Sequence, residues 1–95
     1  MMAHLISSTK AKKLVEKGAT LVDLRSPVDF AVSSLPHAVN ITLRNVSRMM
    51  MLNKKTPLVF FGASDDDADI KQAENYAIQM GFEKVFLLGS IKNWE

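Results

Sequence analysis

A cluster of carboxylates follows the most apolar segment of the chain. Within residues 65–69, four of five side chains are acidic, namely Asp65, Asp66, Asp67 and Asp69. Aspartates at alternate positions copy the start of a calcium-binding loop, but Ile70 stands where that loop needs glycine and Tyr76 where it needs glutamate. We therefore predict no metal site. We expect Asp67 to cap the following helix and Asp69 to lie in its first turn, where an acid contributes about 0.3–1 kcal/mol.

Two nucleophile arrangements can be compared with the same region. Gly62-Ala63-Ser64 after an apolar segment resembles a nucleophile elbow, but Asp66 replaces the second glycine of that motif. Such a serine also needs a histidine, and the chain offers only His4 and His37. The Asp-x-Asp at residues 67–69 lies too far after the strand for an aspartate nucleophile. Neither arrangement predicts an active site.

Cysteine is absent from all 95 residues. This removes disulfides, thiolate metal sites and every mechanism that uses a cysteine nucleophile or a persulfide. We expect no cofactor. The 47% hydrophobic and 23% charged content is ordinary for a globular protein, and the length predicts one domain over residues 1–95.

The charge of the chain is small but unevenly placed. The net charge is +2, yet residues 1–57 carry nine Lys or Arg against three Asp or Glu, and residues 58–95 carry three against seven. Such a small net charge predicts no nucleic-acid partner. No apolar run approaches the roughly 18 residues of a membrane span, and the N-terminal residues do not resemble a secretion signal. We expect a cytoplasmic protein without a membrane partner.

Strands and helices are predicted to alternate along the chain. Short apolar segments at residues 20–24, 38–41, 57–61 and 84–88 are typical of buried strands. Helical segments are predicted between and before them, at residues 8–17, 28–32, 43–52 and 68–80. This alternation predicts an α/β fold with right-handed βαβ units, in which a small parallel sheet of 4–5 strands has helices on both faces.

Three consecutive methionines lie in the segment 43–52. Helical spacing predicts that Leu43, Val46 and Met50 face the core. Met49, Met50 and Met51 cannot all face inward on one helix, so at least one is expected at the surface. Because methionine is flexible and polarizable, we consider these three residues a candidate interaction surface.

Four segments, in order, resemble the rhodanese-like domain family. Residues 21–30, Leu-Val-Asp-Leu-Arg-Ser-Pro-Val-Asp-Phe, are similar to its opening strand, Asp-x-Arg and short acidic helix. Residues 35–41 resemble its Ile-Pro-Gly-Ala-x-Asn-Ile segment, with His37 at the glycine. Residues 57–61 take the place of the strand before the active-site loop, and residues 81–94 resemble the closing Gly-Phe…Val…Leu-x-Gly-Gly…Trp pattern. The resemblance spans residues 5–94 and implies a rhodanese-like fold.

The resemblance also implies roles for three charged residues of the opening motif. Asp23 is expected to end its strand near the active-site loop. Arg25 is expected to pair with Asp29, the acid of the next helix. We interpret all three as scaffold rather than as a catalytic site.

In the family, a cysteine leads the loop and an arginine closes a Cys-x-x-x-x-Arg pattern. Counting from the strand puts Gly62 at the cysteine position, and counting back from Gly81 puts Ser64 there; both registers stay open. The arginine position then holds Asp67 or Asp69. An acidic loop repels anionic substrates, and the missing cysteine excludes the sulfurtransferase mechanism of the family.

Two functions remain open after this comparison. The first is an inactive rhodanese-like domain that binds or regulates a protein, with residues 62–69 as a contact face for a basic partner. The methionine segment is expected to border that face. The alternative is an enzyme or accessory subunit with non-cysteine chemistry at the same loop. The oligomeric state, a homodimer included, is left open.

Overall fold

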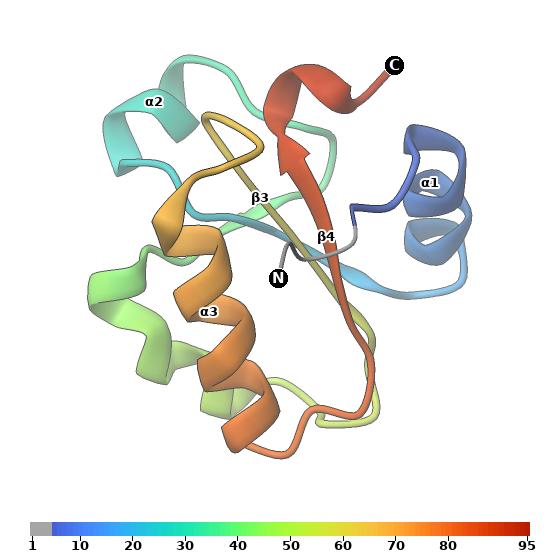
Figure 1. Cartoon of the computed structure of the whole chain (residues 1–95), viewed down its shortest axis with the longest axis vertical. Coiled ribbons are helices and arrows are strands. Elements are labelled where there is room, and N and C mark those ends of the chain that lie inside the picture. The colour runs from blue at the N-terminus through green and yellow to red at the C-terminus, as the bar shows by residue number, and fades with distance from the viewer. Residues whose placement is uncertain (1–4) are drawn as a thin grey trace.

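The apolar segments form four parallel strands in one sheet of order β2-β1-β3-β4. The structure is a computed structural model, and it describes residues 5–95. The strands are β1 (Thr20–Asp23), β2 (Val39–Asn40), β3 (Leu58–Gly62) and β4 (Val85–Ser90). Beside β4, Leu5 forms a single parallel bridge with Leu87. The predicted α/β fold with a small parallel sheet is confirmed (Figure 1).

Helices cover both faces of this sheet. They are α1 (Ser8–Glu16), α2 (Pro27–Val32) and α3 (Ala68–Gln79), with two short 3-10 segments, η1 (Leu43–Met51) and η2 (Ile91–Asn93). Each α-helix is preceded by a residue whose side chain accepts a backbone N–H of the first turn. These residues are Ser7 for α1, Ser26 for α2 and Asp67 for α3. In Figure 1, α3 and η1 lie on one side of the sheet and α1 on the other.

The core is split in two by the sheet. Along β3, Leu58 and Phe60 join the cluster under α3 and η1, whereas Val59 and Phe61 join the cluster under α1. All five residues of β3 are buried. This explains why the segment is apolar throughout, since a central parallel strand has no solvent-facing side.

The methionine segment differs from the prediction in its phase. Met49 is fully buried, while Met50 is 66% and Met51 89% exposed. Met50 was therefore wrongly predicted to face the core. The reason is that η1 is a 3-10 segment with a kink at Asn45, and its core residues recur every third position, at Leu43, Val46 and Met49.

Polar residues gather where the four strands end. Asp23, Asn40, Gly62 and Ser90 are the last residues of β1, β2, β3 and β4. Because the strands are parallel, these ends meet at one edge of the sheet, the edge at which ligands bind in open α/β sheets. Within residues 5–95, no helix combines the length and the apolar character that crossing a membrane requires.

Candidate functional site

The loop between β3 and α3 lies at this edge and is organised by its own aspartates. Asp67 Oδ1 accepts the N–H of Asp69 at 2.9 Å, and the N–H of Asp67 donates to the carbonyl of Ser64 at 3.3 Å. Asp67 is thus the N-cap of α3 with Asp69 in its first turn, and both predictions are confirmed. The Asp67 carboxylate caps the helix, and Asp69 adds a negative charge in the first turn, where the helix dipole favours it.

Asp65 holds the loop against the last strand. Its Oδ1 accepts the N–H of Ser90 at 2.9 Å and the side-chain amide of Asn93 at 2.7 Å. The hydrogen bond from Ser90, and to a smaller extent that from Asn93, lowers the pKa of the Asp65 carboxyl below its usual value. Ser90 Oγ adds a bond to the carbonyl of Ala63 at 3.3 Å.

Sequence reasoning missed this role of Asp65, although one signal was available. Gly89 adopts φ +86°, and a Cβ built on it would lie 2.5 Å from Asp65 Oδ1. The glycine before Ser90 is therefore required both by its backbone conformation and by the close approach of the carboxylate. A glycine at a strand end indicates such an approach, but it does not identify what approaches.

Ser64 does not form a catalytic arrangement. Its hydroxyl donates to Asp66 Oδ1 at 3.0 Å, and both side chains are exposed. A serine activated for attack needs a base held in turn by a third group. Of the two histidines considered for that part, His37 lines a hollow beside α1, and His4 lies outside the described residues.

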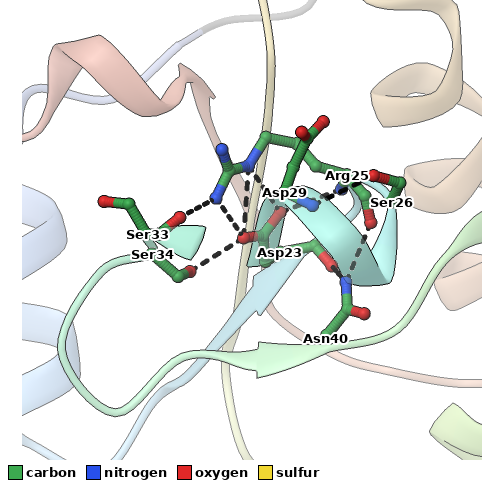
Figure 2. A network of polar contacts seen from close by, with 7 residues as sticks. All are labelled: Asp23, Arg25, Ser26, Asp29, Ser33, Ser34 and Asn40. Carbon is green, nitrogen blue, oxygen red and sulfur yellow. Dashed lines mark hydrogen bonds and ion pairs between the residues drawn. The ribbon is translucent and has the colours of Figure 1, made fainter. Parts of the chain in front are cut away.

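A buried ion pair lies at the end of β1 (Figure 2). Asp23 is fully buried, and the Arg25 guanidinium reaches it in a fork, with the terminal nitrogen 2.9 Å from Oδ2 and Nε 3.1 Å from Oδ1. The Arg25 N–H and the Ser34 hydroxyl also donate to this carboxylate, at 2.9 and 2.8 Å. The buried charge is thus paired and fully hydrogen-bonded, as burial of a carboxylate requires.

The expected pair between Arg25 and Asp29 is wrong. Arg25 is ion-paired with Asp23, and hydrogen-bonding to this carboxylate raises the pKa of Arg25, with a smaller contribution from the charge of Asp29. The Asp29 bond drawn in Figure 2 instead runs from its backbone N–H to Ser26 Oγ, the cap of α2. The physical reason is that Asp23 is buried, where water screens the attraction between opposite charges less, whereas Asp29 is exposed.

The network also joins three segments of the chain. Asn40 donates its side-chain amide to the carbonyls of Asp23 and Arg25, both at 2.9 Å. Arg25 donates to the carbonyl of Ser33 in the turn after α2. The ends of β1 and β2 and this turn are therefore tied together, and these contacts fit the scaffold role predicted for Asp23 and Arg25.

In residues 5–95, no cluster of three His, Cys, Asp or Glu side chains has the arrangement of a metal site. Asp65 Oδ1 and Asp67 Oδ1 each accept a backbone N–H of the fold itself.

The expectation that the methionine segment borders the acidic loop is wrong. Met51 ends η1 and is followed by the turn that leads into the start of β3, and the carbonyl of Lys54 in this turn accepts the N–H of Glu83, just before β4. Figure 1 shows η1 beside α3, with its end leading to the opposite end of β3 from the loop.

The fold and this edge define a class of protein, a small α/β domain in which a loop at the end of a central parallel strand leads into a helix. The family model described as Rhodanese-like domain matches residues 7–95, and the chain belongs to this family. The resemblance drawn from the motifs is confirmed. The member found here contains no cysteine.

Two curated relatives match shorter stretches. The tRNA 2-selenouridine synthase of Cronobacter sakazakii is 45% identical over 38 residues, which are 40% of this chain and 10% of that protein. The protein of the same name from Sulfurovum sp. is 41% identical over 44 residues, 46% of this chain and 12% of its own. The chain thus spans about a tenth of the length of these relatives.

Solved structures match nearly the whole chain. The rhodanese-like domain of an Anabaena sp. protein superposes with a TM-score of 0.78 at 25% identity, covering 98% of this chain and 74% of that one. A human single-domain sulfurtransferase gives a TM-score of 0.77 at 22% identity, covering 97% and 95%. The latter likeness concerns the fold.

Proposed function

We propose that this chain is a rhodanese-like domain without sulfurtransferase activity, which acts as a protein-binding or regulatory module through the loop after β3. The observation that carries the proposal is the chemistry of that loop. The chain has no cysteine, and the two candidate positions hold Gly62 and Ser64. Glycine offers no nucleophile, and a serine oxygen cannot carry a persulfide sulfur.

The charge of the loop supports a protein partner over an anionic substrate. The arginine position of the family holds Asp67 in one register and Asp69 in the other, and Asp66 is exposed. Like charges repel a thiosulfate or a phosphate, whereas the same carboxylates attract a basic protein surface and accelerate its encounter.

The order of the loop supports the same role. Asp65 fixes it to Ser90 and Asn93, and Asp67 fixes it to α3. A contact surface that is already ordered loses less conformational entropy when a partner binds. The loop therefore offers a fixed acidic face.

A first experiment tests the absence of catalysis. The purified chain is incubated with thiosulfate and cyanide, and separately with phosphoesters and esters in the presence of divalent metals. We expect product formation at the level of the protein-free blank in each assay. Turnover that disappears in Ser64→Ala or Asp67→Asn would overturn the proposal in favour of an enzyme with non-cysteine chemistry at this loop.

A second experiment tests the loop as a contact face. The immobilised chain is used to capture proteins from its native extract, and Asp66→Lys is compared with Glu83→Lys. Both positions are exposed, but Glu83 precedes β4 at the other end of the sheet. We expect a basic protein that is retained at low salt, released as screening increases, kept by Glu83→Lys and lost by Asp66→Lys. Equal capture by all three proteins would contradict the acidic loop as the interface.

A further inference from the structure

A hollow of about 240 Å³ lies beside α1, on the other side of the molecule from α3. Its walls come from α1, from the turn between α2 and β2, and from the C-terminal segment, and they are Lys12, Val15, Glu16, Pro36, His37 and Trp94. Figure 1 shows that turn passing between the C-terminal segment and α1. We propose that this hollow binds a small carboxylic acid with an aromatic or aliphatic body.

The walls of the hollow favour a small apolar body. Val15, Pro36 and Trp94 are apolar, and Val15 and Trp94 also pack against the core cluster under α1. The volume is below the roughly 300–1,000 Å³ of sites for drug-sized ligands. The hollow is therefore suited to a ligand of about ten non-hydrogen atoms or fewer, held between walls that the core keeps in place.

The hydrogen-bond donors at the hollow favour an anion. The Lys12 ammonium lies 5.3 Å from the centre of the Trp94 ring, and Lys12 takes part in neither of the two ion pairs found in residues 5–95. Glu16 is the one acid among the six lining residues. Lys12 and the His37 ring therefore offer hydrogen-bond donors to a carboxylate, against the single acid Glu16.

His37 is the second, independent observation. It adopts φ +63°, and among residues 5–95 it is the one non-glycine residue in this left-handed region. The corresponding position of the family motif is a glycine, which accepts that conformation without strain. Non-glycine residues in strained conformations gather at functional sites. A histidine kept in such a conformation at the rim of the hollow is explained if its ring donates a hydrogen bond to the bound acid.

The test uses Trp94, the only tryptophan of the chain, as the reporter. The full chain is titrated with 3-phenylpropanoate, and with 3-phenylpropan-1-amine as the cationic counterpart. We expect a saturable change in Trp94 fluorescence with the acid, and shifts of the backbone amide signals of Val15 and His37 at the same concentrations. The amine should bind at least threefold more weakly. No saturable change in either signal, or equal binding of the amine, would overturn the proposal.

Variants separate the ligand site from the fold. His37→Gly should bind the acid more weakly while its melting midpoint stays the same or rises, a combination that a merely structural role does not produce. Lys12→Gln should weaken binding of the acid by roughly two- to fivefold, as expected for a partly exposed ion pair, and Glu16→Gln should strengthen it. Lys13→Gln, on the same helix but outside the hollow, is the matched control. Unchanged affinity in both His37→Gly and Lys12→Gln would contradict the assignment.

Discussion

Asp65 accepts the backbone N–H of Ser90 at 2.9 Å although the two residues are 25 positions apart in the sequence. Ser90 is also the residue paired with Gly62 at the end of the β3–β4 ladder. The Asp65 carboxylate thus adds a side-chain hydrogen bond at the end of the ladder, on the last residue of β4. The loop after β3 is thus held against the end of β4 by this bond and against η2 by the bond from Asn93.

Replacing Asp65 by asparagine should therefore destabilise the fold at neutral pH. The pKa of Asp65 is lowered in the folded chain by the bonds from Ser90 and Asn93, while the unfolded value lies near about 3.9. A lowered folded pKa stabilises the fold above the unfolded pKa, and this stabilisation is lost as the pH falls through the folded pKa. Thermal unfolding should give a lower melting midpoint for Asp65→Asn at pH 7 and a difference that shrinks below about pH 4.

The control for this prediction is Asp66→Asn at the neighbouring position. Asp66 is exposed and bonds only to the Ser64 hydroxyl among the hydrogen bonds of residues 5–95. Asp66→Asn should leave the melting midpoint nearly unchanged at pH 7 and at pH 3. A difference for Asp65→Asn that is the same at pH 7 and pH 3 would contradict a role of the ionised carboxylate.

Removing the Arg25 side chain should be costly because Asp23 stays behind. In Arg25→Ala, the buried carboxylate keeps the N–H of residue 25 and the Ser34 hydroxyl but loses its cation. Losing charged hydrogen bonds of this kind costs about 2–3 kcal/mol. At about 4–8 °C per kcal/mol for a domain of this size, the melting midpoint should fall by at least about 8 °C.

Asp29→Asn distinguishes the observed ion pair from the expected one. Asp29 accepts no bond from Arg25 and acts on it only through its charge, so this change should cost less than about 1 kcal/mol, the usual effect of an acid in a first helical turn. The loss of stability in Arg25→Lys should lie between those of Asp29→Asn and Arg25→Ala. An ammonium keeps the positive charge but cannot form the two parallel hydrogen bonds of the guanidinium. Equal destabilisation by Asp29→Asn and Arg25→Ala would show that the acidic helix matters as much as Asp23.

Relieving the backbone strain at His37 should raise the stability of the fold. A non-glycine residue in the left-handed region costs about 1 kcal/mol or more, and glycine adopts φ +63° freely. Part of this gain is lost to the greater freedom of glycine in the unfolded chain. The melting midpoint of His37→Gly should therefore rise by a few degrees, measured by scanning calorimetry, and a fall of several degrees would contradict the strain.

The C-terminal residues should contribute to stability. Ile91 and Trp94 pack against the core cluster under α1, and Asn93 bonds to Asp65 and to the carbonyl of Leu88. Deleting residues 91–95 should lower the melting midpoint by several degrees, at about 4–8 °C per kcal/mol. An unchanged midpoint would mean that this segment does not pack on the sheet in solution.

Local features of the fold could be predicted from the sequence. The caps at Ser26 and Asp67 follow from side chains that satisfy free N–H groups at a helix start, which is a matter of two or three residues. The apolar run of β3 likewise follows from burial on both faces. The order of motifs then predicted the family.

Contacts between distant segments could not be predicted in this way. Nothing near Asp65 in the sequence indicates Ser90 or Asn93, and the turn at His37 meets Trp94 only because both lie beside α1. The prediction of which η1 residues are buried was wrong for a different reason. A tighter helix repeats every three residues, so Met49 replaced Met50 as the buried residue.

The β-bridge between Leu5 and Leu87 lies on the free edge of the sheet. The N–H of Ile6 donates to the carbonyl of Leu87 at 2.8 Å, beside the bridge between Leu5 and Leu87. Such a contact occupies part of the free edge of β4, where unpaired backbone groups would otherwise be a template for another strand. Leu5 and Ile6 therefore cover part of an edge to which another strand could otherwise pair. The next residues of this edge, Leu88 and Gly89, carry no charge that would repel a second molecule.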